Sequence, residues 1–488
     1  MTLRSKMAHG AMWSLVEKAG SQGISFIVFM FVARLIGPKE FGLANICFLI
    51  YYLPHLVILG VADGIVSLQI NDARRLSTMF WCVIGGGCFL TLSIIAGAPG
   101  VASLMGDPRL ESLLRWFSLV FLCMTALVVP NKLAYAALDF RILALRTLTA
   151  SVASGVVGLV LAFQGLGAYA IIAQQIVLYF VMNIIVWRYV DWRPHFVFDV
   201  SVLKASLLPG FKTMGSDVIF FAEYQIPPLF IGGDLGPVAL GYYAFVMRIC
   251  FALLEITINP VLTVLYPFLT KIKEDHDEQK LILGQVISLM GTLMFPILAL
   301  GADTAPLYVP LFFGTAWIPA VPVLQFFLCG SSVLPILITI RESVRAHNKI
   351  GSYLKVQVPV VIFGLLVTVI LLPHGLVAMS AGVVACTFCI VPVYAYFFKH
   401  WVSISLWQPI ARLVRPLMAV VMMLVAVHLF KSASFYPQNA WGELFSVLAL
   451  GVAVYLSACF LVQRQEIMKA ISFAKKISPG KDLPSLAA

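Results

Sequence analysis

Long apolar segments follow one another along almost the whole chain, separated by short polar connections. About fourteen of them reach the roughly 20 residues that a helix needs to cross a membrane. Only 11% of the 488 residues are charged, against about a quarter in soluble domains. Too few polar side chains are therefore present to cover a water-exposed surface. The sequence predicts an all-α polytopic membrane protein.

The predicted membrane segments are spaced evenly and leave no room for a sizeable extramembrane domain. The longest polar connections are 188–204 and 271–280. We expect the segments near 12–33, 41–63, 78–104, 113–131, 147–165, 168–187, 205–232, 240–270, 281–303, 316–340, 355–372, 375–398, 410–430 and 441–463.

Lysine and arginine are distributed unevenly among the connections. With a cytoplasmic N-terminus, those on the inside outnumber those outside by roughly five to one. We therefore expect both termini to be cytoplasmic, with a basic tail over 464–488. The N-terminus does not resemble a cleaved signal peptide, because Glu17 and Lys18 interrupt its apolar core. The net charge of +11 then reports orientation and contact with anionic membrane lipid, and nucleic acid is not expected as a partner.

A short motif of the form GPxxxG occurs twice, at 37–42 and at 236–241. Proline fixes its own φ and disfavours helix in the residue before it, so each copy should end one helix and start the next. Six predicted segments separate the copies, and an even number gives both halves the same membrane orientation. We predict an N-lobe over 1–195, a C-lobe over 196–400 and two additional helices within 401–463.

Charged residues inside membrane segments are costly and therefore candidates for function. They gather in the first two segments of each half, whereas the other segments carry charges only near their ends. The sequence thus predicts a hydrated cavity between the halves. Its cationic candidates are Lys18, Arg34, Lys212 and Arg248. Its polar lining candidates are Ser14, Ser21, Gln22, Ser25 and Ser216. Its candidate coupling-ion or ion-pair carboxylates are Glu17, Asp63, Asp217, Glu223 and Glu255.

A second interpretation of these groups is purely structural. In it the charges pair with one another, for example Lys18 with Glu17 or Asp217, and only fix helix packing.

Other chemistry is not indicated. The eight histidines have no metal-ligand spacing, and no nucleotide-binding loop is present. Cys386 and Cys389 match a redox spacing but lie within a predicted membrane helix, where packed thiols are the alternative. We expect no catalytic residues, no metal and no cofactor apart from a coupling ion, H⁺ or Na⁺.

The N-terminal motifs are similar to those of a known family. Gly10 and Trp13 form a Gly-x-x-Trp motif, the run 33–42 reads ARLIGPKEFG, and the run 138–141 reads LDFR. Together they resemble the polysaccharide transporter family, the bacterial flippases of lipid-linked O-antigen and exopolysaccharide units within the multidrug/oligosaccharidyl-lipid/polysaccharide (MOP) superfamily. The resemblance implies two six-helix lobes in an inverted V, two further C-terminal helices, and alternating access to a central, often cationic cavity lined by the first two helices of each lobe.

The leading hypothesis is therefore a flippase of the bacterial cytoplasmic (inner) membrane. It would move undecaprenyl-diphosphate-linked oligosaccharides outward for lipopolysaccharide or exopolysaccharide biosynthesis, beside a polysaccharide polymerase and glycosyltransferases. One alternative is a cation-coupled multidrug antiporter of the same superfamily, against which the internal Arg and Lys argue. A membrane-embedded glycosyltransferase or ligase would need a large extramembrane loop, which the sequence lacks.

Overall fold

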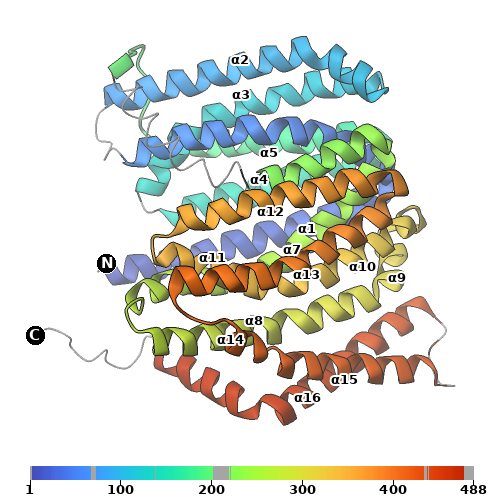
Figure 1. The fold of residues 1–488 in the computed structure, drawn as a ribbon. Coiled ribbons are helices and arrows are strands. Elements are labelled where there is room, and N and C mark those ends of the chain that lie inside the picture. The colour runs from blue at the N-terminus through green and yellow to red at the C-terminus, as the bar shows by residue number, and fades with distance from the viewer. Residues whose placement is uncertain are drawn as a thin grey trace, which may run out of the picture. The chain divides into compact units, whose positions relative to one another are not determined.

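The computed structural model describes residues 3–67, 73–137, 139–201, 219, 221–433, 437 and 439–477. This part of the chain is helical and contains no β-strand; Figure 1 shows the helices in chain order. The long helices are α1 (Leu3–Ser67), α2 (Ala73–Met105), α3 (Arg109–Ala136), α4 (Phe140–Phe163), α5 (Ala168–Tyr189), α7 (Gly236–Lys271), α8 (His276–Asp303), α12 (Ile350–Leu371), α13 (Leu376–Val402), α15 (Val414–Lys431) and α16 (Ala440–Ile477). The shorter ones are α9 (Ala305–Tyr308), η1 (Val309–Phe313), η2 (Thr315–Ala320), α10 (Val321–Gly330), η3 (Ser331–Val333), α11 (Leu334–Ala346), η4 (Leu372–His374) and α14 (Trp407–Ala411). Residues 221–234 are also helical.

Twelve helices in the described part are long and apolar enough to cross a membrane. This confirms the predicted class of protein, although not the predicted number of about fourteen segments. Two predicted segments, 12–33 and 41–63, both fall within α1, on either side of its bend at Gly37. Most of the segment 205–232 lies outside the described residues.

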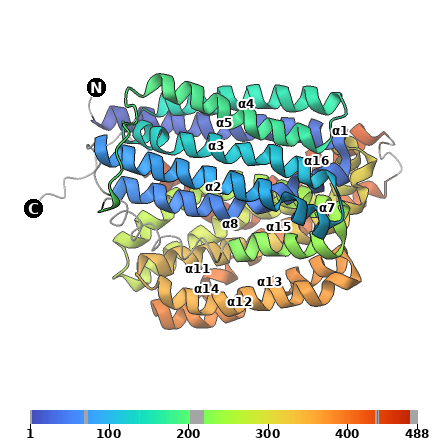
Figure 2. The ribbon, with the colours of Figure 1, turned by 90° about the horizontal axis from the view of Figure 1, so that it is seen from above.

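The chain divides into two compact units, which we describe separately. The first comprises residues 1–248, 312–323 and 357–382. Within it α2 packs on α3, α4 on α5, and α1 on α3, α4 and α5, so that α2–α5 lie side by side with α1 (Figure 2). Its interior is made of apolar side chains from these helices, such as Val28, Phe117, Phe121 and Leu143.

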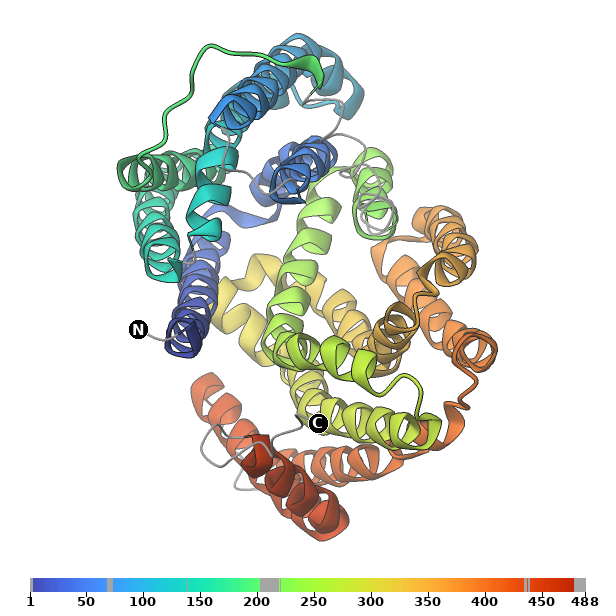
Figure 3. The same cartoon turned by 90° about the vertical axis from the view of Figure 1, so that its left-hand side faces the viewer.

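The second unit comprises residues 249–311, 324–356 and 383–488. Its organising helix is α8, which α11, α14, α15 and α16 contact. Viewed nearly end-on, α15 and α16 lie beside one another along one flank of α8 (Figure 3). The side chain of Asp275 starts α8 by accepting hydrogen bonds from the backbone N–H groups of Asp277 and Glu278. The first unit contains segments from both predicted lobes, whereas the second begins only at residue 249, and the predicted lobe boundaries remain a prediction.

The helix α1 bends where the first GPxxxG motif occurs. Gly37 has φ 75° and ψ 174°, and helical geometry resumes from Pro38. The equivalent glycine of the second copy, Gly236, has φ 80°. A positive φ is strained for a residue with a Cβ atom, so glycine is required at both positions. The prediction that each Gly-Pro pair ends one helix and starts the next is confirmed.

Candidate functional site

The two GPxxxG copies pack directly against each other in the first unit. A Cβ atom added to Gly42 would lie 1.8 Å from the carbonyl oxygen of Pro237, and one added to Gly241 would lie 2.0 Å from that of Pro38. The contact is therefore reciprocal: the glycine that ends each copy meets the proline of the other. Only a residue without a side chain permits so close a backbone approach. The duplication seen in the sequence thus builds one crossing between α1 and α7.

An aromatic cluster packs beside this crossing. Trp317 of η2 is fully buried, and its indole N–H donates to the carbonyl oxygen of Ala33, 3.0 Å away, just before the bend in α1. Its ring stacks on Phe245 of α7 with centroids 4.3 Å apart and meets Phe41 edge-on at 5.7 Å. Phe29 lies 5.8 Å from the ring of Phe245. These contacts tie α1, α7 and η2 together and support the crossing with apolar area.

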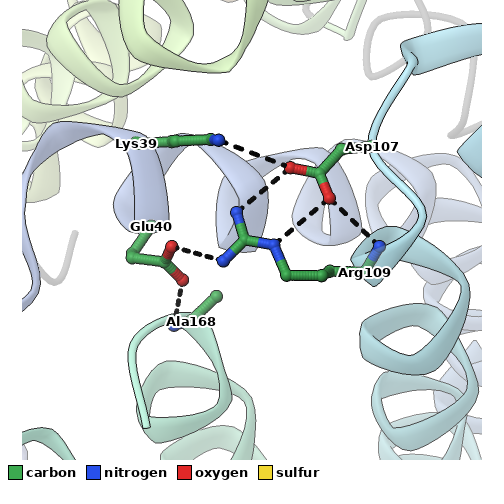
Figure 4. A network of polar contacts seen from close by, with 5 residues as sticks. All are labelled: Lys39, Glu40, Asp107, Arg109 and Ala168. Atoms are coloured by element: carbon green, nitrogen blue, oxygen red, sulfur yellow. Dashed lines mark hydrogen bonds and ion pairs between the residues drawn. The ribbon is translucent and has the colours of Figure 1, made fainter. Parts of the chain in front are cut away.

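The charged residues of the first motif join two connections of the first unit (Figure 4). Arg109 donates to Glu40, with Nη1 2.8 Å from Oε1, and to Asp107, with Nη2 3.1 Å from Oδ2. The other oxygen of Glu40 accepts the backbone N–H of Ala168 at 3.0 Å, at the start of α5. Lys39 lies 3.9 Å from Asp107. Three segments therefore meet at one end of the unit: the bend of α1, the connection from α2 to α3, and the connection from α4 to α5. Helices that cross a membrane in alternating directions place these segments on the same side.

Electrostatics outside the membrane segments follow from these contacts. The hydrogen bonds and charge of Arg109 lower the pKa of Asp107 below its ordinary value. Beyond the other end of α4, the phenol of Tyr189 donates to Asp139, which also caps α4, and these bonds lower the pKa of Asp139. Both carboxylates are thus held ionised at neutral pH.

A cation meets the predicted polar face of α1. Arg248 of α7 donates from Nη2 to the hydroxyl of Ser25, and its guanidinium carbon lies 6.0 Å from the centre of the Phe29 ring. Arg248 is exposed and Ser25 half-buried. Lys18 lies two turns before Ser25, about 10 Å along the same face, and is also exposed. The structure therefore brings Ser25 and Arg248 together, with Lys18 on the same stripe.

The rest of this polar stripe agrees with its predicted helical spacing. Ser14, Ser21 and Gln22 are half-buried on α1, and the Ser21 hydroxyl donates to the carbonyl oxygen of Lys18 at 3.2 Å. A face with hydroxyls, an ammonium and a guanidinium can bind an anion through charge-assisted hydrogen bonds.

Glu17 belongs to a different face of α1 from its neighbour Lys18. Its carboxylate lies 3.5 Å from Nη2 of Arg146, whose side chain is only 6% exposed. Thr147 donates to the same carboxylate at 2.6 Å, and Arg146 also donates to Asn131 and Thr147. The structure thus gives Glu17 a buried ion pair with Arg146 of α4, a partner other than the Lys18 named in the structural interpretation of the sequence.

The other predicted carboxylates are dispersed. Glu223 accepts a hydrogen bond of 3.1 Å from Gln357 within the first unit. Glu255 is half-buried in the second unit. The side chain of Asp63 and all of Lys212, Ser216 and Asp217 lie outside the described residues.

Arg34 is exposed just before the bend in α1 and passes beside Gly314, whose added Cβ would lie 3.8 Å from its Cγ.

Sequence reasoning missed two buried charges. Their positions near predicted segment ends gave no sign of burial, yet Arg146 is 5% exposed within α4 and Glu342 is 4% exposed within α11. Glu342 lies 3.7 Å from Arg345, whose guanidinium covers the ring of Tyr266 at 4.5 Å. Both charges lie within a few residues of a predicted segment end, and only their burial and partners reveal them as structural.

A helical chain with these candidate spans is a polytopic membrane protein, and its fold is shared with a solved flippase. Superposition on the lipid II flippase MurJ in an inward closed conformation gives a TM-score of 0.73 over 94% of this chain and 100% of that chain, at 14% identity. The chain therefore shares the all-helical fold of that flippase. The likeness to an inward-facing multidrug MATE family transporter has a TM-score of 0.45 and carries no argument.

The chain belongs to the polysaccharide biosynthesis protein family, whose model matches residues 31–322. It is 24% identical over 478 residues to the succinoglycan biosynthesis transport protein ExoT of Rhizobium meliloti (strain 1021), covering 96% of this chain and 95% of that one. It is also 24% identical to the lipopolysaccharide biosynthesis protein WzxC of Escherichia coli (strain K12), over 83% and 82% of the two chains. The family that the N-terminal motifs resemble is thereby confirmed.

Proposed function

We propose that this protein is a flippase that moves lipid-linked oligosaccharides across a bacterial cytoplasmic membrane for surface or exopolysaccharide biosynthesis. Family membership across the body of the chain carries the proposal, since relatives with near-complete coverage are named for succinoglycan transport and lipopolysaccharide biosynthesis. The antiporter alternative has no comparable support. The expected topology keeps both termini in the cytoplasm, and the substrate is handed on to extracytoplasmic polymerisation.

The chemistry of the cationic face supports a phosphorylated substrate. A sugar headgroup on a diphosphate cannot cross hydrocarbon unaided, because its polar groups would lose their hydrogen bonds. Arg248, beside the hydroxyl of Ser25, offers a planar donor set that matches phosphate oxygens. Lys18 on the same stripe adds a second positive charge. We infer that this face holds the diphosphate while the lipid tail stays in the bilayer, during alternating exposure to the two sides.

Deletion of the gene tests the proposed function. Lipid-linked repeat units should accumulate facing the cytoplasm, and surface polysaccharide should be lost until the wild-type gene is returned. Normal surface polysaccharide in a deletion strain without a second copy of such a gene would overturn the proposal.

Substitution of Arg248 tests the proposed phosphate contact. A hydrogen bond to a charged group contributes about 1.5–3 kcal/mol, so Arg248→Ala should lower export about ten- to hundredfold, with Arg248→Lys less affected. The control is Lys273→Ala, which removes a half-buried cation whose nitrogen lies 3.7 Å from the Glu274 carboxylate. Equal export by the Arg248→Ala and Lys273→Ala variants at equal protein levels would exclude this role.

A further inference from the structure

A histidine that the proposed substrate face does not use lies inside the first unit. His55 is on the part of α1 beyond the bend at Gly37, one turn after Tyr51. Its Nδ1 lies 2.9 Å from the hydroxyl of Tyr51 and 3.0 Å from the sulfur of Met124 on α3. The Tyr51 hydroxyl is in turn 2.7 Å from that of Tyr179 on α5. His55 and Tyr51 together therefore link three helices.

The surroundings of this cluster are apolar. Tyr51 is 7% exposed, and its ring packs against Phe117 at 6.0 Å and Phe121 at 5.5 Å. No Lys, Arg, Asp or Glu among the described residues forms an ion pair or hydrogen bond with the cluster. The titratable groups that contact the cluster are Tyr52 on α1 and Tyr179 on α5, and those near it along the same helices are Cys47, one turn before Tyr51, and Cys123, next to Met124.

The hydrogen bonds can be completed both without and with a proton on Nδ1. When Nδ1 is bare, it accepts from the Tyr51 hydroxyl, which accepts from Tyr179. When Nδ1 carries a proton, that N–H can donate to the Tyr51 oxygen or to the Met124 sulfur, while the Tyr51 hydroxyl turns to the sulfur, 3.1 Å away, or to Tyr179. A proton on Nδ1 therefore re-pairs contacts between α1, α3 and α5 while Nδ1 and the Tyr51 hydroxyl each keep a partner.

We propose that His55 is a proton-binding site, and that proton binding there is coupled to transport. The proton comes from water on one side of the membrane and returns to water on the other, with no covalent change. Histidine suits this role because its charge changes between pH 5 and 8. Since α1 also carries the face that meets Arg248, a change of packing beyond the bend can reach the proposed substrate site through the bend at Gly37. The coupling, although not the proton site itself, rests on the proposed function.

The proton site is tested on the purified full-length chain. The thermal unfolding midpoint is followed from pH 5 to 8 for the wild type, for His55→Gln and for His428→Gln, which alters an exposed histidine on α15. The control should retain the wild-type pH dependence, and His55→Gln should lose part of it. Because His55→Gln can also weaken folding, Tyr179→Phe is measured too, and it should shift the midpoint of the pH dependence without abolishing it. Unchanged pH profiles in both cluster variants would overturn the proposal.

Coupling is tested in proteoliposomes containing a lipid-linked oligosaccharide. An imposed pH gradient should accelerate flipping by the wild type and the His428→Gln variant, and the acceleration should be lost in His55→Gln. Gradient stimulation that survives in His55→Gln would refute coupling at this site. A wild type that flips no substrate in this assay would refute the proposed function, while the unfolding profiles still decide whether His55 binds a proton.

Discussion

Adding one methyl group at the crossing of the two GPxxxG copies should separate α1 from α7. In Gly42→Ala the new Cβ would lie 1.8 Å from the carbonyl oxygen of Pro237, whereas carbon and oxygen normally approach no closer than about 3.3 Å. The helices must therefore move apart by about 1.5 Å, because the obstructing atom belongs to the backbone and cannot rotate away. Overpacking of this kind costs about 1–3 kcal/mol.

The matched control is Gly23→Ala in the same helix, where an added Cβ meets nothing within 4 Å. Alanine there should be neutral or stabilise α1 by about 0.5–1 kcal/mol. The assays are thermal unfolding of the purified protein and restoration of surface polysaccharide in a deletion strain. Gly42→Ala should lower both readouts relative to Gly23→Ala. Equal midpoints for the two variants would refute the inference that the crossing tolerates no side chain.

The reciprocal glycine gives a second test of the same contact. Gly241→Ala alone should resemble Gly42→Ala, because its Cβ would lie 2.0 Å from the carbonyl oxygen of Pro38. Once the first substitution has separated the helices, the second meets less obstruction. The double variant should therefore lose less stability than the two single losses added together. Full additivity would mean that the two clashes are relieved independently.

Three further predictions follow from the charged residues. Arg34→Ala should impair export more than Lys39→Ala at equal protein levels, and equal, negligible effects would reduce Arg34 to a feature of the turn. Arg146→Met should lower the thermal unfolding midpoint, because it leaves the buried Glu17 carboxylate without its ion-pair partner, at a cost of about 3–5 kcal/mol. Adding Glu17→Gln should restore part of the lost stability. No recovery in the double variant would contradict the ion pair. The folded-state pKa of Asp107 is lowered, so the stability that its ion pair contributes is complete above the ordinary carboxyl pKa of about 4. It is lost only as the pH falls through the lowered value. Asp107→Asn should therefore leave the shape of the plot of unfolding midpoint against pH unchanged between pH 5 and 8.

Composition and local patterning alone determined the class of protein, most helix positions, the bend in α1 and the family. These properties are encoded within a few adjacent residues: apolar length sets a membrane helix, and a Gly-Pro pair interrupts one wherever it occurs. The polar stripe of α1 was also readable, since residues three and four apart share a helical face. The structure adds that Arg248 meets this stripe at Ser25, and the cavity role expected of both residues stays a prediction.

Only the tertiary structure decided which groups meet. Glu17 and Lys18 are adjacent in the chain but about 100° apart around the helix, so α4 supplies the partner of Glu17 while Lys18 stays exposed. The close approach of Gly42 to Pro237 and the link from His55 to Met124 join residues far apart in sequence. Such contacts depend on how helices pack rather than on any local pattern, and one sequence without its packing cannot distinguish a buried ion pair from a residue of the proposed transport path.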